Sequence, residues 1–123
     1  MKQVIRTNDA PAPKGPYSQA IRANGFIFVA GQIPIDARGN LAPGEIEDQT
    51  RVVLNNLRAI LQSAGSDLNK VVKTTVFIAD LGLFARMNAV YAEFFATDAP
   101  ARSTVQVGLP PGMLLEIECI ATE

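Results

Sequence analysis

Two segments near the end of the chain alternate polar and apolar side chains with a period of two, which predicts two β-strands. In residues 101–107, one face carries polar side chains that include Arg102 and Thr104. In residues 114–120, acidic and apolar side chains alternate, and Glu116 lies on the polar face. The connector contains two prolines and two glycines, which indicates a loop that returns the second strand as the antiparallel neighbour of the first. This arrangement predicts that Arg102 and Glu116 share one wall.

An arginine and a glutamate on one wall allow two interpretations. The first is an ordinary ion pair between strands, at the surface or half-buried. The second is a binding site, because a planar guanidinium presents paired donors at the spacing of two carboxylate oxygens. Pro100 and the Pro110-Pro111 pair restrict the backbone on either side of Arg102. The pattern leaves both interpretations open.

The rest of the chain predicts four more strands and two amphipathic helices. Asn24-Gly25 predicts a hairpin turn, because both residues accept positive φ. The predicted strands are a short apolar start at 1–6, then 17–21, 25–31 and 71–79, and the predicted helices are 45–64 and 82–95. This order indicates an α+β domain, with a mixed sheet covered on one face by two helices. The simplest way to cover the other face of the sheet is association with further copies of the chain.

Asn88 is an exception within the second predicted helix. It lies four residues after Phe84 and three before Tyr91, so it shares the apolar face that should be buried. A buried amide needs hydrogen-bond partners. It serves either as a structural tie to the backbone or as a polar group in a cavity, and the sequence alone leaves both open.

Length, composition and net charge predict a single domain and argue against nucleic-acid and membrane binding. The 123 residues predict one domain, 1–123, with its own core, and the hydrophobic content of 48% is slightly high for a monomer. A net charge of −1 gives no basic footprint for nucleic acid or anionic membranes, and no apolar run approaches the length of a membrane span. We therefore expect no nucleic-acid partner, no membrane partner and a cytoplasmic location.

The chain has no histidine and a single cysteine, Cys119. This composition excludes the common zinc sites, the Ser-His-Asp triad, the Cys-His dyad and an intramolecular disulfide. Cys119 falls on the apolar face of its predicted strand, so we expect a thiol within the core.

Several segments together resemble one known family. They are Gly15-Pro16-Tyr17-Ser18-Gln19-Ala20, Ala30-Gly31-Gln32-Ile33-Pro34, Val72-Lys73-Thr74-Thr75-Val76-Phe77, Met87-Asn88-Ala89-Val90-Tyr91, Pro100-Ala101-Arg102-Ser103 and Leu115-Glu116-Ile117-Glu118. In this order they resemble the RidA (YjgF-like) subgroup of the Rid family of reactive intermediate deaminases. The resemblance implies a chorismate-mutase-like fold, assembled as a homotrimer with ligand clefts between subunits. It also implies hydrolysis of reactive 2-imino or enamine acids to 2-oxo acids and ammonia.

The resemblance assigns site residues one by one. Arg102 matches the arginine that holds the substrate carboxylate in that family. Tyr17, Gly31, Asn88 and Glu116 match other residues of the cleft. Thr104 stands where many members have a cysteine whose backbone meets the ligand, and Ala30 replaces a frequent serine. These two replacements affect the expected substrate preference.

The side chains present are sufficient for this chemistry. The carbon of a protonated imine is already electrophilic, so fixing it beside a water supplies much of the acceleration without a metal, cofactor or covalent nucleophile. The hypothesis is that Glu116 positions or deprotonates the water, that Tyr17 hydrogen-bonds the imine nitrogen or the water, and that Asn88 shapes the pocket.

Two other functions remain alternatives. The first is a non-catalytic carboxylate-binding or regulatory module that uses the Arg102 pocket without turnover. The second is the endoribonuclease or translation-inhibitor role of some relatives, which ranks last because the chain lacks histidine and a basic aromatic patch.

Overall fold

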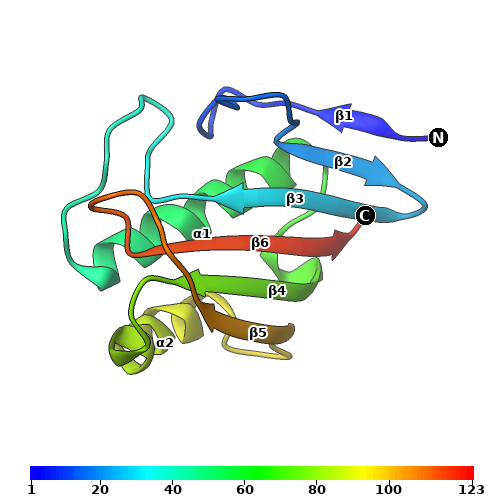
Figure 1. The fold of residues 1–123 in the computed structure, drawn as a ribbon. Coiled ribbons are helices and arrows are strands. Elements are labelled where there is room, and N and C mark those ends of the chain that lie inside the picture. The colour runs from blue at the N-terminus through cyan, green and yellow to red at the C-terminus, as the bar shows by residue number, and fades with distance from the viewer.

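The computed structural model describes residues 1–123 as one six-stranded mixed sheet with two α-helices (Figure 1). The strands are β1 (Gln3–Ile5), β2 (Ala20–Ala23), β3 (Phe26–Gln32), β4 (Val71–Ile78), β5 (Ala101–Gln106) and β6 (Leu115–Thr122). The helices are α1 (Ile46–Ser63) and α2 (Phe84–Phe94), with short 3-10 turns at Leu68–Lys70 and Leu81–Leu83. The expected α+β class is confirmed.

The strand order differs from the sequence prediction at the C-terminus. The order is β1-β2-β3-β6-β4-β5, so β6 lies between β3 and β4 and does not pair with β5. The prediction of a β5–β6 hairpin was therefore wrong, although the two strands do run in opposite directions. Burial explains the order: every residue of β5 keeps some exposure, as suits an edge strand, whereas Leu115, Ile117, Cys119 and Ala121 of β6 are buried.

The predicted hairpin between β2 and β3 is confirmed. Asn24 and Gly25 adopt φ of 57° and 83°, and Ala23 pairs with Phe26 across the turn. Two successive positive φ angles match the right-handed twist of the strands, and only residues such as asparagine and glycine adopt them at little cost.

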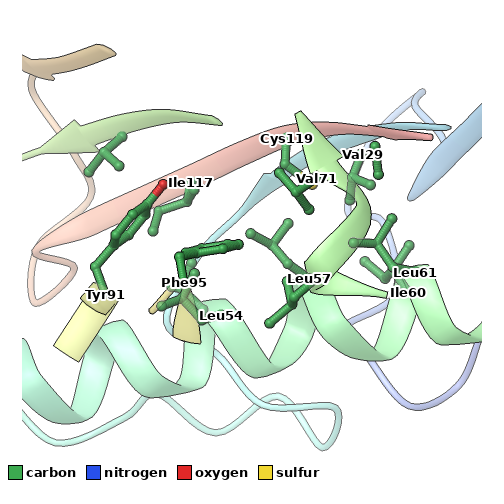
Figure 2. Packing of buried hydrophobic residues seen from close by; sticks show 14 of the residues in the cluster. Val29, Leu54, Leu57, Ile60, Leu61, Val71, Tyr91, Phe95, Ile117 and Cys119 are labelled. Atoms are coloured by element: carbon green, nitrogen blue, oxygen red, sulfur yellow. The ribbon is translucent and has the colours of Figure 1, made fainter. Parts of the chain in front are cut away.

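Both helices pack against the same face of the sheet, as expected. Figure 1 shows α1 behind the central strands and α2 close to β4 and β5. Figure 2 shows the core between the layers, where Leu54, Leu57, Ile60 and Leu61 of α1 meet Val29, Ile117 and Cys119 of the sheet. Cys119 is 3% exposed, so the prediction of a core thiol is confirmed, and burial raises its pKa to about 12. No helix has the length and apolar character needed to cross a membrane.

The opposite face of the sheet has no cover within the chain. We call it the open face; it carries Phe26, Phe28, Lys73, Thr75, Phe77, Ser103, Val105, Glu116, Glu118 and Ile120. Phe28 and Val105 are 44% and 43% exposed. A contiguous exposed patch of this kind is typical of an interaction surface. The homotrimer and the chorismate-mutase-like classification remain predictions.

A buried glutamine joins α1 to the start of β6. Gln49 is fully buried, and its side chain donates to the Gly112 carbonyl at 2.7 Å and accepts from the Leu114 amide at 2.8 Å. Replacement by an apolar side chain leaves both backbone groups without this partner. A polar tie from the helix layer therefore holds the backbone just before β6, the strand that carries Glu116.

We expect Gln49→Leu to lower the free energy of unfolding by about 1–3 kcal/mol, because the Gly112 carbonyl and the Leu114 amide lose their hydrogen-bond partner. Urea unfolding followed by circular dichroism measures the change. Gln62→Leu is the matched control, since Gln62 is exposed on the same helix. Equal effects of the two substitutions would show that the buried tie contributes nothing specific.

Candidate functional site

Arg102 is held in place by three side chains of α2. Its Nη1 donates to Asn88 Oδ1 at 2.7 Å, and its guanidinium carbon lies 4.7 Å from the ring centre of Tyr91 and 5.3 Å from that of Phe84. Contacts of this type with aromatic rings are favourable for an arginine. Arg102 forms no salt bridge within the subunit. The guanidinium is therefore oriented but keeps donors available for an anion.

The structure resolves the two interpretations of Asn88. Its amide oxygen accepts from the Arg102 side chain, so it is a tie to a candidate site residue and not to the backbone. Asn88 and Arg102, which the resemblance assigns to one cleft, are therefore in direct contact within the subunit.

The sequence did not identify Tyr91 as a site residue. The apolar stripe of α2 predicted only a core role, and Tyr91 is indeed 6% exposed. Its hydroxyl also forms a 2.7 Å hydrogen bond with Thr74 Oγ1, while its ring contacts Arg102. Burial raises the pKa of Tyr91, so the hydroxyl stays neutral at ordinary pH. The sequence did contain one signal: Tyr91 adds a hydroxyl group to an otherwise apolar stripe, and a buried hydroxyl needs a hydrogen-bond partner.

A hollow adjoins the guanidinium of Arg102. It has a volume of about 470 Å³ and is lined by Asn88, Tyr91, Ala92, Phe95, Ala99, Pro100 and Arg102. Most of this lining is apolar, with the cation at one side. Such a surface suits a small molecule that combines a carboxylate with a short apolar part.

Thr104 lies two residues along β5 from Arg102 and on the same face. Its hydroxyl is buried and has no hydrogen-bond partner. The Val107 amide donates to Ile78 of β4, and N–H groups alternate along a strand, so the amide of Thr104 points to the free edge of β5. The backbone of Thr104, rather than its hydroxyl, is the group that the structure leaves accessible.

Gly31 and Glu116 form a second group of predicted site residues. A Cβ placed on Gly31 would lie 2.8 Å from Glu116 Cδ and would collide with Oε2. A β-bulge between Val29 and Gln32 sets this part of β3 against β6. A side chain at position 31 would therefore displace the Glu116 carboxylate from its place beside the β3 backbone.

The Glu116 carboxylate has no hydrogen-bond partner or salt bridge within the subunit. Burial raises its pKa above the usual value, and repulsion from Glu118 acts in the same direction. A carboxylate with a raised pKa and free oxygens is suited to accept a proton from water.

Tyr17 lies near Gly31, in the loop that precedes β2. It is 55% exposed, and its hydroxyl accepts from the Lys14 amide at 3.3 Å. Tyr17 and Gly31 line the same hollow of about 90 Å³. Gln19 holds the loop, because its side chain accepts from the Thr7 amide at 2.8 Å and donates to the Pro11 carbonyl at 2.9 Å.

Within one subunit the two groups lie on opposite faces of the sheet. Arg102 is opposite Thr74 on β4, and Glu116 is opposite Phe77. Thr74 and Phe77 are an odd number of residues apart, so their side chains point to opposite faces. The prediction that Arg102 and Glu116 share a wall was wrong for a single subunit, because it assumed a β5–β6 hairpin. The predicted site is divided into an Arg102–Asn88–Thr104 half and a Tyr17–Gly31–Glu116 half.

The unpaired state of Glu116 predicts a stability gain on its neutralisation. A raised pKa means that the folded state binds this proton more tightly than the unfolded state, so stability falls as pH rises through the raised pKa. We expect Glu116→Gln to have a higher thermal midpoint than the wild type at neutral pH. The difference in thermal midpoint should disappear below the ordinary glutamate pKa of about 4.3, where Glu116 is protonated in both the folded and the unfolded wild type. A lower midpoint for the variant at neutral pH would contradict this environment for Glu116.

Comparison with known proteins shows which family this chain resembles. The family model described as Endoribonuclease L-PSP matches residues 7–123. The mouse protein named 2-iminobutanoate/2-iminopropanoate deaminase is 43% identical over 125 residues, covering 100% of this chain and 93% of its own.

Two solved structures show the same fold. A Rid-family protein of unknown function from Yersinia pestis has a TM-score of 0.96 and 49% identity, over 100% of both chains. The E. coli protein TdcF, solved with bound serine, has a TM-score of 0.93 and 41% identity, over 98% of both chains. The chain belongs to the Rid family, which the matching model describes as L-PSP.

Proposed function

We propose that this protein hydrolyses reactive 2-imino acids, such as 2-iminopropanoate and 2-iminobutanoate, to 2-oxo acids and ammonia. The observation that carries the proposal is the Arg102 guanidinium, which Asn88 and two aromatic rings orient while no carboxylate of the chain pairs with it. An oriented and unpaired arginine is suited to bind a substrate carboxylate.

Two relatives support this substrate class. One is named a deaminase of 2-iminobutanoate and 2-iminopropanoate, and another was solved with bound serine, which carries a carboxylate next to an amino-bearing carbon. A 2-imino acid has the same carboxylate beside a nitrogen-bearing carbon, with a C=N double bond in place of the single bond.

The proposed active site needs two copies of the chain, because its halves lie on opposite faces of one sheet. Arg102 and the Thr104 amide lie at the β5 edge of one copy. Tyr17, Gly31 and Glu116 would come from the neighbouring copy. The exposed apolar side chains of the open face support self-association, and a closed ring of three copies would repeat this contact three times.

The proposed reaction adds water across the C=N bond. Arg102 holds the carboxylate and so fixes the protonated imine carbon in front of a water. Glu116 accepts a proton from that water as its oxygen bonds to carbon, and Tyr17 hydrogen-bonds the nitrogen or the water. Glu116 then returns this proton to nitrogen, which makes the nitrogen a leaving group. As the C–N bond breaks, Glu116 takes the proton of the new hydroxyl group, so ammonia leaves and the 2-oxo acid remains; release of that proton to ammonia or water restores the carboxylate. No metal or cofactor is needed for this sequence of steps.

Loss of Arg102 should remove the hold on the substrate carboxylate. We expect kcat/KM of Arg102→Ala to fall roughly 10²-fold, equivalent to about 3 kcal/mol for a pair of charge-assisted hydrogen bonds. The imine is generated in situ by an amino-acid oxidase and trapped with semicarbazide, so active protein suppresses the semicarbazone. Arg58→Ala is the matched control, because Arg58 also lies over an aromatic ring, that of Phe94 at 5.1 Å. Similar losses in both variants would contradict the role of Arg102.

Neutralisation of Glu116 tests the proposed water activation separately. We expect Glu116→Gln to lower kcat by about 10²-fold or more with a small change in KM, as for removal of a general base. Unchanged turnover in a folded, assembled variant would exclude this role for Glu116.

The same measurements distinguish a binding module from an enzyme. A module that only binds carboxylates would bind pyruvate in calorimetry, lose that binding in Arg102→Ala, and leave semicarbazone formation unchanged. Endoribonuclease activity, which the family model's description names, stays the last alternative because the net charge of −1 does not favour RNA binding.

A further inference from the structure

Two opposite charges lie on the open face without a salt-bridge partner. Lys73 of β4 and Glu118 of β6 form no salt bridge within the subunit, and the only hydrogen bond of the Lys73 side chain is a long one, 3.5 Å, to Ser103 Oγ. Together they line a hollow of about 350 Å³, whose other walls are Phe28, Val29, Thr75, Cys119 and Ile120. Both charges therefore border a hollow that also has apolar walls.

Covering this face would make unpaired charges costly. Burial of Phe28 and Ile120, which pair with each other across β3 and β6, would be favourable because it removes apolar surface from water. Burial of an ammonium or a carboxylate without a partner has a large desolvation penalty, and removal of one member of a buried pair is strongly destabilising. A second copy of this chain presents both charges, so the face is complementary to itself.

The proposed cleft brings these charges close to one another. Lys73 lies directly opposite Ala101, the residue before Arg102, one strand spacing of about 4.8 Å inward from the β5 edge. Glu118 lies two residues, about 6.8 Å, along β6 from Glu116. Arg102 points to the helix side and Lys73 to the open face, so the two side chains leave opposite faces of the sheet near the β5 edge. An interface that brings this edge against Glu116 of the next copy also places the Lys73 face against that copy's open face, on which Glu118 lies.

We propose that Lys73 of one copy forms an ion pair with Glu118 of the neighbouring copy, and that this pair fixes the register of the interface that creates the cleft. The proposal rests on the assembly invoked in the proposed function. It also has a consequence for the site, because Glu118 is the charge that repels Glu116 within the subunit. Pairing with the neighbouring Lys73 would offset that repulsion only in the assembled protein.

Charge reversal tests the pairing. We expect Lys73→Glu and Glu118→Lys each to shift the protein to smaller species in analytical ultracentrifugation, with at least a tenfold weaker association. The double variant Lys73→Glu/Glu118→Lys should regain assembly and imine hydrolysis together. Arg38→Glu is the control, because Arg38 lies in an exposed turn between β3 and α1 and should leave assembly unchanged. Circular dichroism verifies that each variant is folded.

Cross-linking distinguishes a pair between copies from a pair within one chain, and it does not require disruptive variants. Lys73→Cys and Glu118→Cys chains of different tag lengths are mixed, reassembled and treated with a short bismaleimide. We expect mixed dimers, and only single chains when each variant is treated alone. Native Cys119 is buried and should not react with the bismaleimide. Treatment of the wild type with the same reagent is the control for this.

The outcomes separate this inference from the proposed function. If the single reversals keep full assembly, or cross-links form only within one variant, the Lys73–Glu118 pair is wrong while imine hydrolysis can still be measured in the wild type. If the wild type is monomeric at all concentrations, the pair and the shared cleft are both wrong. If the wild type assembles and the pair is verified but no imine is hydrolysed, the interface stands and the proposed function fails.

Discussion

The structure depends on a sheet that is covered on one face only. Two helices bury one side of all the central strands, and the other side keeps Phe26, Phe28 and Val105 exposed. The same division separates the candidate site, because Arg102 lies on the helix side and Glu116 on the open side. A single subunit therefore has two incomplete sites, and the physical requirement to cover the apolar face is also what would complete them.

Strand pairing with β4 positions Glu116, and buried amides hold the loops around this half of the site. Gln19 holds the loop that carries Tyr17, and Gln49 holds the backbone just before β6. Asn56 donates to the Ile35 carbonyl at 2.8 Å, in the segment that follows Gly31. Each of these side chains connects a helix or the end of a strand to the backbone of a loop that has no strand pairing. Such ties are specific because an unsatisfied buried amide is costly.

Local elements were predictable from the sequence, and the strand order was not. The periodicity of α1 and the Asn24-Gly25 turn depend on neighbouring residues, so both were predicted close to their observed bounds. The position of β6 depends on which strand buries more apolar surface, which is a property of the whole sheet. The same limit explains why the strand pattern wrongly placed Glu116 on one wall with Arg102. The contact of Tyr91 with Arg102 was missed because a helical stripe predicts burial, not which cation the ring will meet.

The environment of Glu116 combines three features that each oppose a stable fold. Gly31 has no side chain to pack, the carboxylate has no partner, and Glu118 repels it from the same face. A sequence optimised for stability alone would replace at least one of these residues, because each has a simple neutral or apolar substitute. Their coexistence is what a proton acceptor needs: room beside the carboxylate, free oxygens and a raised proton affinity. If Lys73 of a neighbouring copy pairs with Glu118, it offsets one of the two causes that raise the proton affinity of Glu116, and Arg102 of that copy adds a positive charge beside the carboxylate. Assembly would therefore set both the geometry and the basicity of the proposed base.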